Sequence, residues 1–512
     1  MKLLIRRSAG RGRHPAGFAA RSGKPAATLS ARLFSPQARF ACLAGFLVAV
    51  FLLGGGARGD IASLVLLRPL AVVVCGYAVV TLDRATVAAH RGIVGWFAAV
   101  VALVAAQLVP LPPALWHALP GHALLVAVDA ATGNGDAWRS LAIVPDDAFN
   151  ALYSLAVPAA VLLLGIQLSQ QDRNRLLPWL IGLGIASGLL GLLQAIGPSQ
   201  GALYFYRITN PGAPVGLFSN RNHAALFLAC LAPLAAAWLL DNPGDRRRLI
   251  VGLAATAVLT PLAIAGGSRA GLVVAVLGLG GAALMLYRGK FTGGDRRFVT
   301  RAAGTAAAVL VVLSAAFVFF ARSASVDRLL ADEQGGDLRF RAWPVVMDVA
   351  RDYFPWGSGA GSFVTAFQIR EPLELLKPTY FNHAHNDLLE LYVTTGVLGL
   401  ILLGIALAGF AFAGWAAWRK EPATRGASGV DARQARTLAR TASLILMLIA
   451  LASLVDYPLR TPSIGAFAML QWLWLRPRPD AAGFASAAEL DNAGPGRRAN
   501  RPADKKVEHA ST

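Results

Sequence analysis

One polar stretch of the sequence, from Ser323 to about Leu400, gathers residue types that can act on a phosphorylated substrate. Two arginines lie near its start, a glycine-rich turn follows, and two histidines and an asparagine precede an apolar run. A guanidinium group binds two phosphate oxygens at once and keeps its proton, and a neutral imidazole accepts a proton near neutral pH. The stretch therefore predicts a site for a phosphorylated substrate that resides in a membrane. The residues concerned are Arg339, Arg341, Gly357, Gly359, His383, His385 and Asn386.

Each of these groups also has a purely structural explanation. The backbone N–H groups of the glycine-rich turn could approach phosphate oxygens, but a plain turn after Pro355 explains the glycines better, and no Gly-Lys-Ser/Thr follows to make a Walker loop. His383 and His385 do not match a zinc-site spacing, so we expect no metal. A histidine here could instead lie beside the N-cap of a helix that begins near Asp387.

The composition is typical of a polytopic membrane protein. The chain has 512 residues, of which 55% are hydrophobic and 15% are charged, whereas a soluble domain carries about 25% charge. The net charge of +20 could indicate a nucleic-acid partner. The basic residues lie mostly in short loops and in both tails, however, which indicates membrane topology and no nucleic acid. The three cysteines fall in apolar runs, so they predict no disulfide framework.

The apolar runs predict an all-α protein with about twelve transmembrane helices. The predicted spans are Phe40–Gly56, Ile61–Leu82, Gly92–Pro110, Ala148–Leu168, Leu176–Ile196, His223–Leu240, Leu249–Ala265, Ala270–Tyr287, Ala302–Ala321, Leu388–Trp415, Leu438–Val455 and Ile464–Leu475. Residues 1–39 and 476–512 read as disordered cytoplasmic tails, around a transmembrane catalytic domain at 40–475 with an outer loop at 323–387. Lys and Arg gather in the loops that share a side with both tails, so both termini are expected in the cytoplasm.

Arginines on the outer side are candidates for a functional role, because positive charge is depleted there. Arg269 lies in a short turn between two apolar helices, where desolvating a cation is expensive, so we expect an anionic partner. That partner is either a buried carboxylate such as Asp456 or the diphosphate of a lipid. Arg68 lies inside a predicted span and is either functional or a snorkelling residue at a misplaced span end.

Taken together, the motifs resemble the O-antigen ligase and O-antigen polymerase superfamily of bacterial inner membranes. The resemblance covers about residues 145–475. It rests on Phe218-Ser-Asn220-Arg221-Asn222 at the start of a span, Ser268-Arg269 before another, Arg339 four residues before Trp343, Pro355 with Gly357-x-Gly359, and His385-Asn386-x-x-Leu389 leading to Gly396. One departure is that many members have an acidic residue where Thr394 and Thr395 stand, and Glu390 is the nearby acidic alternative.

This resemblance implies a metal-independent, inverting glycosyltransferase of the helical membrane class called C-type, with short helices in its periplasmic loop. The donor would be a glycan on undecaprenyl diphosphate in the bacterial inner membrane, held by Arg269 and Arg339, with His385 as the catalytic histidine and no cofactor. Further candidates for substrate contacts are Arg221, Asn222, Arg341, Gly357, Gly359, His383 and Asn386. The acceptor could be lipid A–core, another lipid-linked repeat unit in a polymerase, or a protein hydroxyl.

A transporter or flippase for the lipid-linked glycan is the alternative from another functional class. Transporters place their charges near the bilayer midplane in broken helices. Here the polar residues gather on one outer face, which favours an enzyme.

Overall fold

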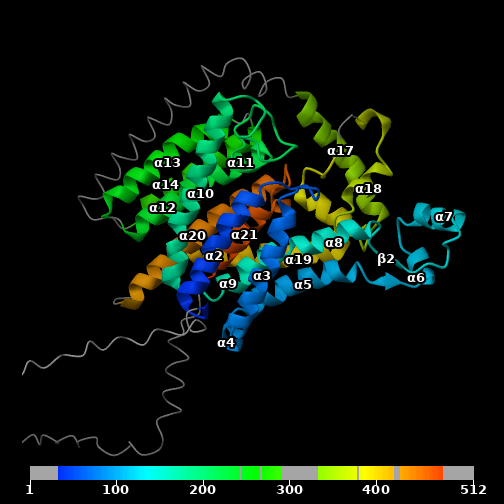
Figure 1. Ribbon diagram of the computed structural model, residues 1–512, viewed down its shortest axis with the longest axis horizontal. Coiled ribbons are helices and arrows are strands. Elements are labelled where there is room, and N and C mark those ends of the chain that lie inside the picture. The colour runs from blue at the N-terminus through cyan, green and yellow to red at the C-terminus, as the bar shows by residue number, and fades with distance from the viewer. Residues whose placement is uncertain are drawn as a thin grey trace, which may run out of the picture.

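The computed structural model describes residues 33–242, 244–265, 268–289, 333–376, 380–419 and 427–476. Most of these residues are helical (Figure 1), which confirms the predicted all-α membrane class. Within them the β-structure is one antiparallel pair, in which β1 (Pro110–Leu111) faces β2 (Arg139–Ser140). The predicted span Ala302–Ala321, the start of the predicted outer loop and most of both tails lie outside the described residues.

The described helices lie in the following order along the chain. They are α2 (Pro36–Leu53), α3 (Leu64–Thr81), α4 (Arg84–Ala89), α5 (Arg91–Ala106), α6 (Pro113–His117), α7 (Ala123–Ala131), α8 (Pro145–Ser154), α9 (Ala156–Gly165), α10 (Gln170–Ile196), α11 (Arg221–Ala229), α12 (Leu231–Asp241), α13 (Arg246–Ala265), α14 (Arg269–Arg288), α17 (Glu333–Asp352), α18 (Phe363–Gln368), α19 (Asp387–Trp418), α20 (Ala427–Ser453) and α21 (Pro462–Leu475), with 3-10 turns η1 (Leu373–Leu375) and η2 (Pro458–Arg460).

Eight helical segments among the described residues are long and apolar enough to cross a membrane. They comprise α2, α3, the α8–α9 pair, α10, the α11–α12 pair, α14, α19 and most of α20. The predicted span Gly92–Pro110 corresponds to α5, a shorter apolar helix. Helices also form at the predicted spans Leu249–Ala265 and Ile464–Leu475, but they are not among the eight. The predicted number of about twelve spans is therefore not confirmed.

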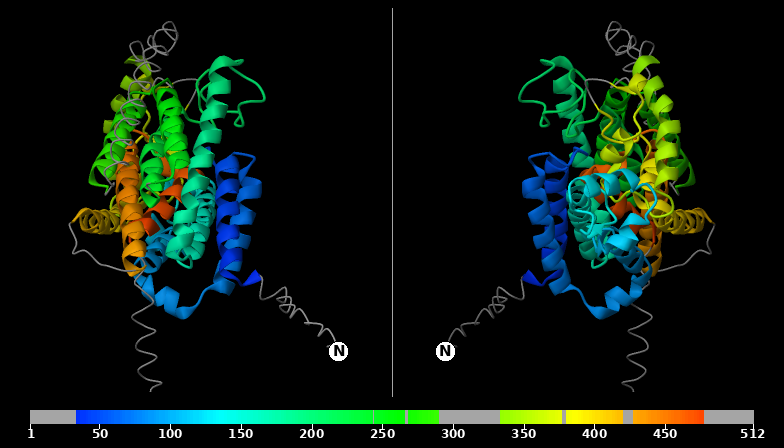
Figure 2. Two further views of the ribbon diagram at one scale, coloured as in Figure 1. Left: turned by 90° about the vertical axis from the view of Figure 1, so that its left-hand side faces the viewer. Right: turned by 90° about the vertical axis from the view of Figure 1, so that its right-hand side faces the viewer.

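One face of the helical bundle, here called the site face, collects the ends of several helices (Figure 2). The N–H groups of Ser219 and Ser463 donate hydrogen bonds of 3.0 Å to the carbonyls of Gly55 and Gly54. These bonds tie the turn after α2 to the segments that open α11 and α21. The starts of α14 and α19 and the end of α20 reach the same face, as the contacts of the site show.

A small unit between α5 and α8 projects from one end of the fold (Figure 1). It contains α6, α7 and the β1–β2 pair, and its Asp129 accepts two hydrogen bonds from Arg139. The N–H of Ile143 donates to the carbonyl of Ser358 at 3.0 Å. This unit therefore braces the glycine-rich turn of the loop that carries the predicted site.

Candidate active site

The histidine segment lies immediately before α19 and is fixed by the N-cap of that helix. The side-chain oxygen of Asn386 accepts hydrogen bonds from the N–H groups of Leu388 and Leu389, and its Nδ2 donates to the carbonyl of Leu454 at 2.9 Å. Asn386 thus holds the start of α19 against the end of α20. His385, one residue earlier, has a φ of 49°, in the left-handed region that non-glycine residues rarely adopt.

Asp456 is the centre of the site. Its side chain is only 3% exposed, and its Oδ1 lies 3.4 Å from Nδ1 of His385. Its Oδ2 accepts a hydrogen bond of 2.6 Å from Nδ2 of Asn222 and lies 3.9 Å from Nε2 of His223. One buried carboxylate therefore joins three segments that are far apart in the sequence: the start of α11, the residue before the N-cap of α19, and the turn between α20 and α21.

The electrostatics of this pair favour a neutral histidine beside an ionised carboxylate. Burial lowers the pKa of His385, Arg339 lowers it further, and Asp456 opposes both effects without cancelling them. Burial would raise the pKa of Asp456, but His385, His223 and Arg339 together hold it well below its usual range. A neutral imidazole whose Nδ1 faces a carboxylate has Nε2 left to accept a proton.

The ring of Tyr457 packs among three histidines. Its centroid lies 4.2 Å from that of His383, 4.9 Å from that of His385 and 5.3 Å from that of His223. Burial and the Asp456 charge raise the pKa of Tyr457 to about 12, so the phenol stays neutral. Tyr457 is therefore an apolar support that fixes the planes of the histidine rings.

A second cluster of charged residues packs against the histidine segment. Glu390 accepts a hydrogen bond from Nδ1 of His383 at 2.9 Å and lies 3.6 Å from Nε of Arg460. The same Nε lies 3.4 Å from Asp387, whose other oxygen accepts from Ser453 at 2.9 Å. Burial lowers the pKa of Arg460, but the two carboxylates outweigh it and raise that pKa. Arg460 thus bridges two buried carboxylates, and one of them, Glu390, holds His383, a predicted candidate for substrate contact.

The two arginines predicted to bind diphosphate belong to α14 and α17. The charge of Arg339, which is half-buried in α17, acts on both His385 and Asp456. Arg269 is exposed at the first position of α14, after the N-cap Ser268, whose hydroxyl accepts from the N–H of Gly271 at 2.8 Å.

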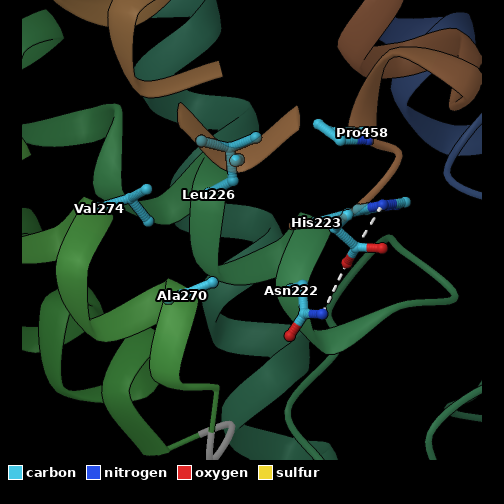
Figure 3. Close-up of a pocket in the computed structure, with 9 residues that line it drawn as sticks. Asn222, His223, Leu226, Ala270, Val274 and Pro458 are labelled. Atoms are coloured by element: carbon cyan, nitrogen blue, oxygen red, sulfur yellow. Dashed lines mark hydrogen bonds and ion pairs between the residues drawn. The ribbon is translucent and has the colours of Figure 1, made fainter. Parts of the chain in front are cut away.

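A cleft connects α14 with the Asp456 centre (Figure 3). Its cavity volume is about 10 Å³, which is the room that one water molecule needs. Ala270 and Gly271, which follow Arg269, line it together with Asn222, His223 and Asp456. Apolar side chains from α11, α14 and α20 complete its walls: Leu226, Val274 and Ala452. Arg269 therefore directly precedes two residues that line this cleft.

The predicted glycine-rich turn has a structural role in this fold. The N–H groups of Gly357, Ser358 and Gly359 already donate to the carbonyls of Tyr353, Val393 and Thr394. The last two carbonyls are released from α19 because the helix kinks at Gly396, where φ is 57°. These N–H groups are thus committed to bracing the kink, and we do not include Gly357 and Gly359 in the proposed substrate site.

The other predicted residues lie nearer the edge of the site or away from it. Arg341 is exposed on α17, two residues beyond Arg339. The backbone N–H of Arg221, in the first turn of α11, donates to Asn210 at 2.9 Å. Arg68, in α3, donates to the hydroxyl of Ser154 at 3.3 Å, between membrane helices.

The sequence motifs do not identify Asp456 as the partner of His385. They also do not identify Tyr457 and Arg460 as residues that pack against the histidine segment and its network. One signal was available for all three, because Asp456–Pro462 is a short turn that concentrates polar residues between two apolar helices.

The fold and the site define a polytopic membrane protein with a buried acid–base pair beside arginines. Residues 254–404 match the family described as O-antigen ligase. The matched region contains Arg269, Arg339 and His385, whereas Asp456 lies beyond it. The match supports an enzyme of the glycosyltransferase-like ligase and polymerase class. A search of curated proteins finds no match.

Proposed function

We propose that this protein is a glycosyltransferase that moves a glycan from undecaprenyl diphosphate to an acceptor hydroxyl. The observation that carries the proposal is the His385–Asp456 pair, which shares one face of a membrane bundle with Arg269 and Arg339. A glycosyl transfer from a diphosphate is assisted by a base that takes the acceptor proton and by positive groups that stabilise the leaving diphosphate. Here the base has an orienting carboxylate, and two guanidinium groups carry the positive charge. The family match and the membrane helices support a lipid-linked donor.

In the proposed reaction, the acceptor oxygen attacks the anomeric carbon of the donor and its proton passes to Nε2 of His385. The bond between that carbon and the diphosphate oxygen breaks, and its electron pair leaves with the diphosphate. Because the acceptor enters opposite the leaving group, the anomeric configuration inverts. Asp456 orients the imidazole through Nδ1 and stabilises the imidazolium that forms.

Arg269 and Arg339 would stabilise the negative charge that grows on the leaving diphosphate. Removing one fixed donor of this kind typically costs about 3 kcal/mol of transition-state stabilisation. Arginine suits this task because its planar fork binds two phosphate oxygens and does not lose its proton. The proposed mechanism requires no metal ion and no cofactor.

The proposed setting is the bacterial inner membrane, with the site face toward the periplasm and both termini in the cytoplasm. The basic side chains at the opposite ends of the helices, such as Arg246, Arg247 and Arg248 at the start of α13, support this orientation. The partners would be the lipid-linked glycan, membrane lipids and an acceptor glycolipid or glycan. The same chemistry would serve a ligase acting on lipid A–core or a polymerase joining repeat units.

A deletion strain tests this function. Gel analysis of lipopolysaccharide and exopolysaccharide should show glycan missing from its acceptor, while the lipid-linked glycan accumulates outside the inner membrane. Accumulation inside the inner membrane would instead indicate a flippase and contradict the proposal. Loss of long chains with single repeat units still attached to the acceptor would assign the polymerase reaction.

A further inference from the structure

The backbone at His385 needs external support to keep its conformation. Its φ of 49° lies in the left-handed region, which costs a non-glycine residue free energy and persists only when neighbouring contacts enforce it. The peptide groups around Ala384 supply those contacts. The carbonyl of Ala384 accepts a hydrogen bond of 3.2 Å from Nε1 of Trp343, and its N–H donates 3.0 Å to Oε2 of Glu390.

Glu390 makes the most concentrated set of contacts to this segment. Its side chain is 2% exposed, and it accepts from Nδ1 of His383 at 2.9 and 3.2 Å as well as from the N–H of Ala384. Arg460 lies 3.6 Å away and offsets the charge of the carboxylate. Glu390 belongs to the first turn of α19, which packs firmly on α20 through the contacts of Asn386 and Asp387. A rigid helix therefore holds the two residues before His385 through a single side chain.

We propose that Glu390 is a positioning residue, which aims the imidazole of His385 at the acceptor hydroxyl by fixing the peptide that precedes it. This inference rests on the proposed glycosyl transfer with His385 as the base. It assigns Glu390 no contact with the substrate, because both carboxylate oxygens are engaged with His383, Ala384 and Arg460.

The chemistry of the contacts requires a carboxylate at this position. Two N–H donors and a guanidinium converge on Glu390, and a carboxylate offers two acceptor oxygens to meet them. A glutamine of the same shape offers one acceptor oxygen and turns an NH₂ group toward a donor. Glu390→Gln should therefore loosen the segment without opening a cavity, whereas Glu390→Ala removes all of the contacts and leaves Arg460 with one carboxylate fewer.

The test measures initial rates of glycan transfer in proteoliposomes containing the full-length protein and a lipid-linked donor. We expect Glu390→Gln to lower kcat about 10- to 100-fold, as a misplaced catalytic group does, with the KM for the donor unchanged. The matched control is Glu374→Gln, which alters an exposed acidic residue of the same loop and should keep wild-type kcat. Wild-type kcat in Glu390→Gln, or a raised KM with unchanged kcat, would overturn the inference.

A double variant distinguishes positioning from a general structural role. If Glu390 acts through His385, adding Glu390→Gln to His385→Ala should not lower the residual rate further. A further 10-fold loss in the double variant would show that Glu390 acts independently. Where Glu390→Ala fails to give a monodisperse protein, the isosteric Gln variant carries the test, with rates normalised to folded protein.

The same set of variants separates the two proposals. Full activity of His385→Ala would remove the proposed function itself. An inactive His385→Ala protein together with a fully active Glu390→Gln protein would contradict only the positioning role.

Discussion

Nδ1 of His385 lies 3.4 Å from Oδ1 of Asp456, although His385 precedes α19 and Asp456 follows α20. The pair exists because these two helices pack with the start of one beside the end of the other. Asn386 donates to the carbonyl of Leu454 and Ser453 donates to Asp387, so the two helix ends are fixed to each other. A carboxylate beside Nδ1 favours the tautomer that carries its proton there, which leaves Nε2 as the acceptor that a base requires.

Asp456→Asn should reduce transfer strongly and move its pH dependence. The amide no longer fixes the tautomer of His385, so we expect the rate to fall on the order of 100-fold. The Asp456 charge raises the pKa of His385, and its loss lowers that pKa. Because the base must be neutral, the acid side of the pH–rate profile should shift to lower pH. Asp348→Asn, an exposed carboxylate on α17, is the control and should change neither quantity.

Arg339→Gln should shift the same profile in the opposite direction. Arg339 lowers the pKa of His385, so removing its charge raises that pKa and moves the acid side of the profile to higher pH. The rate should also fall, because one charge facing the diphosphate is lost, which corresponds to about 3 kcal/mol. Arg351→Gln, on the same helix, removes an exposed ion pair and should have little effect. A profile that stays in place would show that Arg339 does not act on the base.

Arg269→Lys tests whether binding of the diphosphate at this position needs the planar guanidinium group. Lysine keeps the charge but loses bidentate binding of phosphate oxygens, so we expect a markedly lower kcat/KM. The measurement is transfer from a lipid-linked donor at several donor concentrations. A lysine variant with wild-type kcat/KM would show that charge alone suffices and would weaken the proposed diphosphate contact.

Gly396→Ala should destabilise the protein, because α19 kinks there with a φ of 57°. A Cβ atom at this position would overlap the carbonyl oxygen of Pro355, so strain and overlap together should cost about 3 kcal/mol. Thermal unfolding in detergent measures the effect. Gly404→Ala is the matched control, since its Cβ would meet nothing within 4 Å on the same helix. Equal melting temperatures for the two variants would contradict the bracing role of the glycine-rich turn.

The spans that the sequence predicts best are those whose apolar runs match the thickness of a bilayer. The predicted run Leu176–Ile196 ends where α10 ends, and Ala270–Tyr287 lies one residue inside each end of α14. Shorter runs are ambiguous, because a helix such as α5 can be apolar without having the length of a full span. The total therefore could not be fixed by composition alone.

The residues of the site also differ in how far the sequence predicts them. Residue type and spacing indicate Arg269, Arg339 and His385, since each lies in a local motif. Asp456 carries no such motif, and its position beside His385 depends on how α19 packs against α20. In sequence, Gly357 and Gly359 are typical of an anion-binding turn. In the fold, the carbonyls of Val393 and Thr394 accept hydrogen bonds from this turn, and they are free to do so only because α19 bends at Gly396.

The most direct measurement of the central claim is the rate of glycan transfer by purified His385→Ala protein in proteoliposomes supplied with a lipid-linked donor and acceptor. We expect a rate at least about 100-fold below that of the wild-type protein, at equal protein level and with the donor still bound. Transfer at the wild-type rate would contradict the assignment of His385 as the base.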